Sequence, residues 1–434
     1  MTKKILLILL TLILVNQKVF AVSLSEALLQ AYINNPELNA ERENFKVSKE
    51  NLNISKSEFL PSLTLSSSNS NESTDKLTNR SGDDVSPTDV NSKIQAITIE
   101  QTLFQGFAGV ARFEKSKIGL NLAEAKLLKR EQETIYKAIE AYTGLVFAKK
   151  KLDINKKNVN LFERTVETAQ ARLERGQITL SDLAQSESSL AGAQAKYIQA
   201  KNNDVTAKLI YEKVIGPITN ADNLTTNPDI KFQIPNNLNE AIKMSKKNNP
   251  DLIISKLEYE QSEKDVKIAA ADFSPSATLS LKSSKTDDLS SSYDEQDKDT
   301  ITTTISWPLF KGGKNIASLK KSRNQKNIKK FLFDNAIKSN NSNVASAWSN
   351  LQSSKSLLNS AKLQVQAAEI ANEGITQEYE SGRGGRSTLD VMQSNSILLN
   401  SKISLADFER NYLLSQFSLL QSVGLLRSDY LKLQ

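Results

Sequence analysis

Four segments of the chain alternate apolar and polar residues, and this pattern predicts four β-strands. They lie at residues 62–70, 95–104, 276–283 and 300–309. A period of two places successive side chains on opposite faces, so each strand has one apolar and one polar face. Each segment has about ten residues, which is the length of a tilted strand that crosses a lipid bilayer.

The segments that join the strands of each pair have a different composition. Residues 66–93 and 283–299 are rich in Ser, Asn and Asp. Clusters of these residues are typical of solvated connections. We therefore expect both segments to be loops.

Apolar residues at every third or fourth position predict long helices. One such stripe, which includes Ile135, Ile139 and Tyr142, runs without proline from Gly106 to about Arg175. It predicts a single helix of about 65 residues, hence about 100 Å long.

Each long helix is followed by a shorter return helix, so the chain is expected to form two helical hairpins. The first covers residues 106–215 with its tip near 176–181, and the second covers residues 312–423 with its tip near 381–387. Their apolar stripes are rich in Ala and Ser, and their other faces are charged. Such hairpins cannot bury a compact core alone, so they need lateral neighbours.

The order of these elements occurs twice. The sequence INNPELNA at residues 33–40 returns as KNNPDLII at residues 247–254, so Pro36 and Pro250 are 214 positions apart (250 minus 36). Further matching phrases follow in the same order, which is typical of a tandem repeat. We assign residues 22–216 to repeat 1, 217–237 to a linker or equatorial segment, 238–426 to repeat 2 and 427–434 to a C-terminal tail.

The repeated phrase is expected to end one helix and start the next. Asn35 suits the N-cap, Pro36 suits the first helical position, and Glu37 suits the positive end of the helix. We predict helices at about 24–33 and 36–58, with equivalents in repeat 2. The phrase is interpreted as structural punctuation without a function of its own.

The N-terminus predicts export. Lys3 and Lys4 precede an apolar run from Ile5 to Val15, and small residues stand at the −3 and −1 positions before a cut after Ala21. This is the pattern of a signal peptide, here residues 1–21. No later segment approaches 18 consecutive apolar residues, so a transmembrane helix is not expected.

The amino-acid composition limits the kinds of reaction and binding site that the chain can provide. The chain of 434 residues contains no Cys and no His, which removes thiolate chemistry, the commonest general base and the commonest metal ligand. We therefore expect no enzyme activity, metal site or cofactor. The formal net charge of +7 is modest, and opposite charges are interspersed, so nucleic-acid binding is not expected.

Four strands cannot close a barrel, and an open sheet edge is not tolerated in lipid. Membrane barrels start at eight strands, so several chains must pool their strands. Two chains would give eight strands and three would give twelve. With the long hairpins on one side, such an assembly is a conduit.

The whole mature chain resembles the TolC-type outer-membrane efflux proteins. The resemblance rests on the ordered phrases LSEAL, NNPEL, FLPSLTLS and LFQGF, repeated as LNEAI, NNPDL, FSPSATLS and LFKGG, and on the hairpin tips. It implies a mainly α, mixed α+β fold in which a homotrimer forms a twelve-stranded barrel in the lipid of the outer membrane above a periplasmic α-barrel. It also implies an exit channel of a tripartite efflux pump or type I secretion system, which pairs with a periplasmic adaptor and an inner-membrane pump or ABC transporter.

In such proteins the hairpin tips close the periplasmic entrance like an iris. By this resemblance, Tyr379, Arg386 and Asp390 match the gate residues of the second tip, and Asp182 matches their partner in the first tip. Gln393 stands where the prototype has a second aspartate, and the tip phrase GRGGR carries two extra residues. A charge-assisted bond between Arg386 and Asp182 is one expected latch. Carboxylates repeated around a narrow axis would attract cations.

Two other interpretations agree less well with the sequence. An exported coiled-coil structural or adaptor protein without pore activity would explain the hairpins but not the four alternating segments. A glycosidase-like enzyme needs two carboxylates in a fixed cleft, and runs such as Asp83-Asp84 and Asp294-Glu295 are expected in loops.

Overall fold

The computed structural model describes residues 23–78, 80–85, 88–218, 224–225, 230, 232–290, 293–382 and 385–433. The predicted signal peptide at residues 1–21 lies outside these residues. Two units can be distinguished. The first unit contains residues 1–42, 127–250 and 337–434, and the second unit contains residues 43–126 and 251–336.

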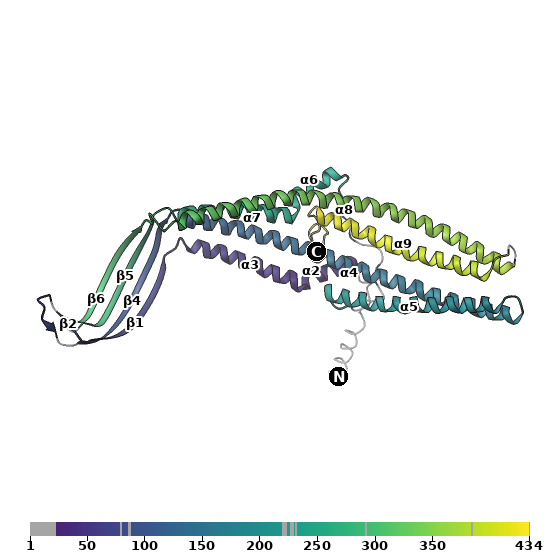
Figure 1. The fold of residues 1–434 in the computed structure, drawn as a ribbon, viewed down its shortest axis with the longest axis horizontal. Coiled ribbons are helices and arrows are strands. Elements are labelled where there is room, and N and C mark those ends of the chain that lie inside the picture. The colour runs from purple at the N-terminus through teal and green to yellow at the C-terminus, as the bar shows by residue number, and fades with distance from the viewer. Residues whose placement is uncertain are drawn as a thin grey trace, which may run out of the picture. The chain divides into compact units, whose positions relative to one another are not determined.

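The second unit contains the long β-strands (Figure 1). They are β1 (Ser62–Thr74), β4 (Thr88–Gln105), β5 (Ser276–Ser290) and β6 (Tyr293–Ser306), and they form one sheet in the order β1-β4-β5-β6. All three pairings are antiparallel. The short strands β2 (Leu77–Thr78) and β3 (Asp84–Val85) pair with each other in the connection between β1 and β4.

The strands extend well into the segments expected to be loops, and that expectation was wrong for much of residues 66–93 and 283–299. The β1–β4 ladder continues to the pair Thr74–Thr88, and the β5–β6 ladder continues to Ser290–Tyr293. The reason is that ladder hydrogen bonds join backbone groups, so polar side chains do not interrupt them. β6 ends at Ser306, earlier than residue 309, because Pro308 has no N–H to donate.

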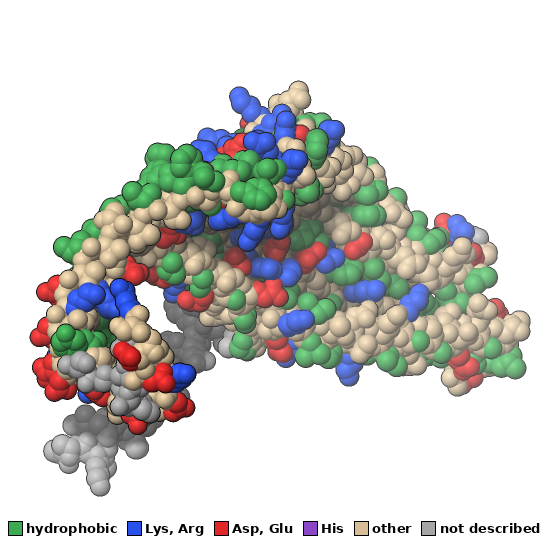
Figure 2. Space-filling model, turned by 60° about the vertical axis from the view of Figure 1, so that its left-hand side comes forward, with side chains coloured by type: hydrophobic (Ala, Val, Ile, Leu, Met, Phe, Trp, Pro, Cys, Tyr) green, Lys and Arg blue, Asp and Glu red, His purple; other side chains and the backbone are tan. Residues whose placement is uncertain are grey.

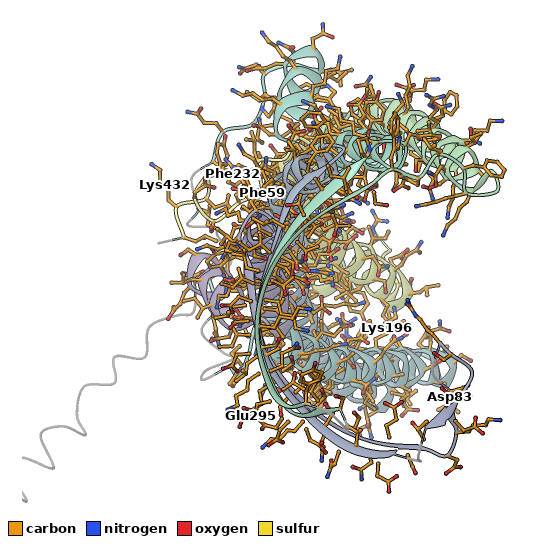
Figure 3. All side chains as sticks on the ribbon, turned by 90° about the vertical axis from the view of Figure 1, so that its left-hand side faces the viewer. Phe59, Asp83, Lys196, Phe232, Glu295 and Lys432 are labelled. Atoms are coloured by element: carbon orange, nitrogen blue, oxygen red, sulfur yellow. The ribbon has the colours of Figure 1, made fainter. Side chains whose placement is uncertain are left out.

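The polar ends of the strands are acidic. β6 exposes Asp294, Glu295, Asp297 and Asp299, and acidic side chains gather over this end of the sheet in Figure 2. Figure 3 labels Glu295 on the curved sheet. Lys285 lies 3.7 Å from Glu295, so part of this charge is paired across the β5–β6 ladder. These side chains keep the extended ladder in water.

The opposite ends of the strands carry an exposed apolar row. Leu63 pairs with Ile99, Ile99 with Leu281, and Leu281 with Ile301, so the four side chains follow one another across all four strands. Leu63 is 72% exposed and Ile301 is 76% exposed. Large apolar side chains in a contiguous row are rarely left in water, so this row marks an interaction face.

Helices α3 (Pro36–Ser57) and α7 (Pro250–Ala271) precede β1 and β5. In the second unit, α7 is joined to α4 (Ala108–Glu174) by two reciprocal ion pairs. Glu114 binds Lys264 at 2.6 Å and Lys115 binds Asp265 at 2.6 Å. The hydrogen bond from Lys264 lowers the pKa of Glu114, so the pair stays charged to a more acidic pH than an isolated glutamate would. Because the partners come from different repeats, these pairs hold the two repeats together.

The first unit contains the parts of the two helical hairpins that include their tips. The first hairpin consists of α4 and α5 (Leu180–Val214), and the second consists of α8 (Lys314–Ser381) and α9 (Thr388–Ser422), with the two helices of each hairpin side by side in Figure 1. No helix among the described residues is both long enough and apolar enough to cross a membrane.

The repeated phrase forms the same turn in both repeats. Helix α2 (Leu24–Asn34) ends at Asn35, and α6 (Leu238–Asn248) ends at Asn249, with nearly identical backbone angles at the two asparagines. The Asn35 side chain accepts a hydrogen bond from the Leu38 N–H, which makes it the N-cap of α3. This confirms the predicted punctuation in repeat 1.

The main core of the first unit gathers residues from both repeats. Tyr211, Phe417 and Leu426 are all at most 1% exposed and belong to one cluster. The C-terminal segment joins it through Leu431 and Leu433. The ring of Phe232 packs against that of Phe417 at a tilt of 47°, with ring centroids 4.8 Å apart, and Figure 3 labels Phe232 beside the C-terminal segment. The tail is therefore part of the core.

Each return helix ends at a glycine with positive φ. Gly216 follows α5 with φ +127°, and Gly424 follows α9 with φ +80°. A Cβ atom at Gly424 would collide with the backbone carbonyl of Asn248, the last residue of α6. Only glycine allows this approach of α9 to α6.

Candidate functional site

Each long helix ends at a glycine with positive φ whose N–H donates to the carbonyl three residues earlier. At the first tip, the N–H of Gly176 donates to the Leu173 carbonyl and the N–H of Gln177 donates to the Arg172 carbonyl. This pair of bonds with a glycine at φ +68° is a Schellman motif, which ends α4. At the second tip, Gly382 has φ +66° and its N–H donates to the Tyr379 carbonyl.

Both return helices start with a capping box. Thr179 is the N-cap of α5, and its N–H and hydroxyl lie 2.9 and 2.8 Å from Asp182 Oδ2. Ser387 is the N-cap of α9, and its N–H and hydroxyl both lie 2.8 Å from Asp390 Oδ2. Asp182 and Asp390 are therefore equivalent residues in the two repeats, and each satisfies otherwise unpaired groups at a helix start.

These hydrogen bonds stabilise the charged forms of both carboxylates. The backbone and hydroxyl donors of Thr179 lower the pKa of Asp182, and those of Ser387 lower the pKa of Asp390, with a smaller contribution from Arg386. Because the folded pKa is depressed, the stabilisation is complete above the unfolded value of about 3.9 and is lost as pH falls through the folded pKa.

We therefore expect the first turns of α5 and α9 to lose protection from hydrogen exchange when the pH is lowered from about 6 to a value below the depressed folded pKa of the two carboxylates, because protonated carboxylates no longer accept both hydrogen bonds. Exchange rates corrected for the intrinsic pH dependence measure this. Ser387→Ala should weaken protection of α9 at both pH values and leave α5 as a control. Equal protection of α5 at both pH values would exclude the capping role of its carboxylate.

Tyr379 connects the two hairpins. The guanidinium carbon of Arg172, in the last turn of α4, lies 4.2 Å from the centroid of the Tyr379 ring on α8. This is the distance of a cation–π contact. The Tyr379 hydroxyl lies 2.9 Å from the Thr388 hydroxyl at the start of α9. The side chain of Tyr379, which belongs to α8, thus contacts both α4 and α9 near the hairpin tips.

Arg386 has a different partner from the one expected. Its Nε donates to Glu378 Oε2 at 2.7 Å, across the second tip, and this bond raises the pKa of the guanidinium. Within the chain, the expected bond between Arg386 and Asp182 is not among the contacts of the described residues. The physical reason is local: Asp182 already caps its own helix, and Glu378 lies beside the loop that carries Arg386.

The five residues expected at the gate thus occupy the two tips, but they are not one cluster. Tyr379, Arg386 and Asp390 surround the second tip, and Asp182 belongs to the first tip. Gln393 lies exposed one turn after Asp390 on α9. Position 393 shares a helix face with position 390, because residues three apart are neighbours on a helix.

Sequence reasoning missed Arg172, Glu378 and the two N-caps. The pattern Thr179-x-x-Asp182, repeated as Ser387-x-x-Asp390, is a capping-box signature that was visible in the sequence. The stack of Arg172 on Tyr379 joins residues more than 200 positions apart, and no local pattern predicts it. Among the described residues, no group of three or more His, Cys, Asp or Glu side chains could hold a metal ion.

The comparison with protein families matches the family described as outer membrane efflux protein at residues 27–216 and 241–425. The two matched segments begin 214 positions apart (241 minus 27), which is the offset of the repeated phrase. Together they cover more than half of the chain.

Several known proteins are similar over nearly their full lengths. The outer membrane efflux protein BepC of Brucella suis is 26% identical over 424 residues, which cover 97% of this chain and 90% of BepC. The alkaline protease secretion protein AprF of Pseudomonas aeruginosa is 21% identical over 410 residues, 93% of this chain and 84% of AprF. The CmeC outer membrane channel of Campylobacter jejuni has a similar fold, with a TM-score of 0.82, 18% identity, and coverage of 92% of this chain and 85% of CmeC.

Proposed function

Because the chain belongs to the family of outer membrane efflux proteins, we propose that three copies of it pool their strands and hairpins into one channel that the hairpin tips close. As a family member, the chain is an outer-membrane efflux protein. The proposal concerns its assembly, its gate and its partners.

The observation that carries the assembly is the sheet. Its order leaves one edge of β1 and one edge of β6 unpaired within the described chain, and its apolar row is exposed across all four strands. An unpaired edge cannot stay open in lipid. Closure by other copies satisfies the edges, and lipid covers the apolar row. Three copies give twelve strands, which is the number that the resemblance to TolC-type proteins implies.

Exposed aromatic side chains at the junctions of strands and helices support the same placement. Phe59 and Phe107 lie at the junctions of repeat 1, and Phe273, Trp307 and Phe310 lie at those of repeat 2; all are more than a third exposed. Trp307 Nε1 donates to the Phe273 carbonyl at 3.0 Å, which fixes the indole. Aromatic rings at the ends of membrane-spanning strands are typical of the membrane–water interface. We assign this belt to one face of the outer membrane.

The gate is proposed at the tips. Arg172, Tyr379 and Thr388 join the two hairpins of one chain, and Arg386 with Glu378 braces the second tip. Around a threefold axis, Asp390 and Asp182 would each be repeated three times. Aspartates are charged at neutral pH, and the lowered pKa of both extends this to more acidic pH, so they would form negative rings that attract cations.

The partners follow from the type of channel. We propose that a periplasmic adaptor and an inner-membrane pump or ABC transporter deliver cargo to the tips, in a tripartite efflux pump or a type I secretion system. The similarity to BepC, an efflux protein, supports a role in an efflux pump. The similarity to AprF, a protease secretion protein, supports a role in a secretion system.

The decisive experiment is planar-bilayer recording of the mature chain, residues 22–434, purified from membranes as an oligomer whose mass is measured. Stable conductance steps from a trimer support the proposal. A folded monomer without conductance, even with a gate variant such as Arg386→Ser, would instead indicate an exported coiled-coil protein.

The charge of Asp390 can be separated from its capping role. We expect Asp390→Asn to reduce the cation-over-anion permeability ratio by roughly twofold or more, because one ring of three charges is lost while the side chain still accepts a hydrogen bond. Reversal potentials in a salt gradient measure the ratio. Ser387→Ala is the matched control, since it weakens the cap and retains the charge. An unchanged ratio in Asp390→Asn would place Asp390 away from the constriction.

A further inference from the structure

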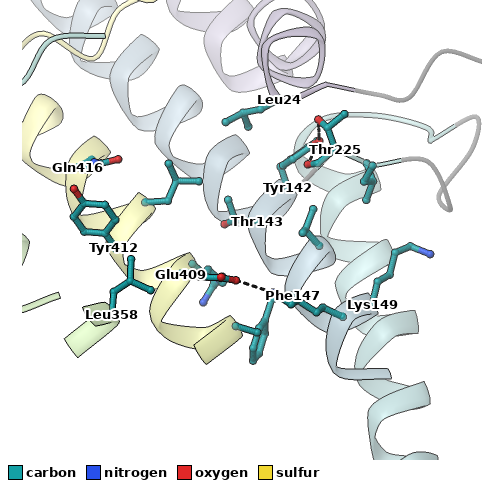
Figure 4. Close-up of a pocket in the computed structure, with 16 residues that line it drawn as sticks. Leu24, Tyr142, Thr143, Phe147, Lys149, Thr225, Leu358, Glu409, Tyr412 and Gln416 are labelled. Atoms are coloured by element: carbon teal, nitrogen blue, oxygen red, sulfur yellow. Dashed lines mark hydrogen bonds and ion pairs between the residues drawn. The ribbon is translucent and has the colours of Figure 1, made fainter. Parts of the chain in front are cut away.

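A pocket of about 780 Å³ lies between α4 and α9 in the first unit (Figure 4). Leu24 of α2 and Leu358 of α8 also line it. The Tyr142 hydroxyl donates to the Thr225 carbonyl at 3.0 Å and so fixes one wall. Small-molecule sites have volumes of about 300–1,000 Å³, so this pocket is large enough for a ligand.

One part of the pocket is apolar. Val146 and Phe147 of α4 and Leu413 of α9 contribute to its lining, together with Leu24 and Leu358. A ligand with a hydrocarbon chain would remove this surface from water, which is favourable and needs no directional contacts. The apolar lining by itself does not select among ligands.

The charged part of the lining selects the sign of the ligand. Four charged side chains line the pocket: Lys149, Lys150, Glu409 and Arg410. Lys150 Nζ lies 2.7 Å from Glu409 Oε2, an ion pair that crosses from α4 to α9. Lys150 and Glu409 neutralise each other, and Arg410 beside them gives this part of the lining a positive charge. A cationic ligand would therefore be repelled.

Arg410 provides the specific donor. Its Nε is buried and has no hydrogen-bond partner. Its Nη2 lies 3.8 Å from the position that a Cβ atom would take at Gly144, so the guanidinium lies against the backbone of α4. A buried unpaired donor is unfavourable, and a carboxylate matches the guanidinium because it can accept two parallel hydrogen bonds.

We propose that this pocket binds an anionic amphiphile of the fatty-acid type, with its carboxylate on Arg410 and its alkyl chain along Phe147 and Leu413. The site lies in the helical wall and uses none of the tip residues. It therefore assigns to the channel a ligand site that is separate from its gate.

The test uses the purified oligomer in amphipol and the fluorescent probe 11-(dansylamino)undecanoic acid. Saturable binding is expected, with competition by laurate but not by dodecyltrimethylammonium, which has the same chain length and the opposite charge. Arg410→Gln should weaken probe binding about tenfold, because one charge-assisted hydrogen bond is lost. Arg410→Lys retains the charge and should weaken binding less.

The matched control is Lys156→Gln, which removes one positive charge from an exposed position of α4 outside the pocket. It should leave probe affinity unchanged. The proposal is overturned if Arg410→Gln oligomers of normal mass bind the probe as tightly as the unaltered protein, or if the cationic competitor displaces it equally. Because the readout is fluorescence, the result is independent of conductance, and a silent channel would not affect it.

Discussion

Replacement of Arg172 by glutamine is expected to shift the channel toward its open state and raise its mean conductance. In the structure, the guanidinium of Arg172 lies 4.2 Å from the centroid of the Tyr379 ring and so links the end of the first hairpin to the end of the second. In the proposed gate, opening would separate the tips, so this contact between hairpins would stabilise only the closed state. Glutamine retains a polar side chain but carries no positive charge, so it cannot make the cation–π contact with the Tyr379 ring.

The size of this effect follows from the number of copies. A cation–π contact at an accessible site contributes about 0.5–1 kcal/mol. Three copies that open together would lose about 1.5–3 kcal/mol, which corresponds to about a ten- to hundredfold change in the ratio of open to closed channels. Single-channel recordings of open probability measure this ratio directly.

Two controls separate the stack from other causes. Tyr379→Phe retains the aromatic ring and removes only the hydroxyl that meets Thr388, so it should open the channel less than Tyr379→Leu. Arg175→Gln removes one charge from an exposed position at the same tip and should leave the open probability unchanged. If Arg175→Gln opened the channel as much as Arg172→Gln, net charge at the tips would be responsible and the stack would not.

Replacement of Gly424 by alanine is expected to cause a large loss of stability. Two costs add. Alanine is strained at the φ of +80°, and its Cβ would collide with the backbone carbonyl of Asn248, which cannot rotate away as a side chain would. We expect the free energy of unfolding to fall by at least about 3 kcal/mol. Helix α9 would have to move away from α6, which would open the core around Leu419 and Val423.

Gly176→Ala is the matched control for this substitution. Gly176 also has positive φ, at +68°, but nothing lies within 4 Å of the position that its Cβ would take. It should therefore show only the conformational cost, about 1–2 kcal/mol. Urea unfolding of the two variants gives the comparison. Equal destabilisation would mean that α6 and α9 do not make the close contact.

The sequence predicted the main elements because their signals are local and repeated. The alternation at Leu63 and Leu65 and the helical stripe through Ile135 and Ile139 each require only neighbouring residues. The matching order of phrases in two halves predicted two equivalent hairpins, and the two capping boxes at Asp182 and Asp390 bear out that equivalence at the level of hydrogen bonds. The strand ends were less predictable, since a backbone ladder continues through polar residues wherever its partner strand does.

At the tips, the sequence located the hairpin ends and supplied residues by resemblance, but it did not give their partners. Arg386 binds Glu378, and Tyr379 meets Arg172 and Thr388. Two of these contacts lie within ten residues along the chain, yet several carboxylates compete for the same arginine. Which one pairs with it depends on the path of the tip loop.

The sequence by itself determined the repeat, the hairpins, the alternating strands and the family, because each is written in the spacing of residues along one segment. Only the tertiary structure decided which sides of those segments meet. The stack of Arg172 on Tyr379, the unpaired Nε of Arg410 between α4 and α9, and the contact of Gly424 with Asn248 all join distant parts of the chain. Such contacts depend on how helices pack in three dimensions, and the hydrophobic pattern of each helix fixes its buried face but not the neighbour that covers it.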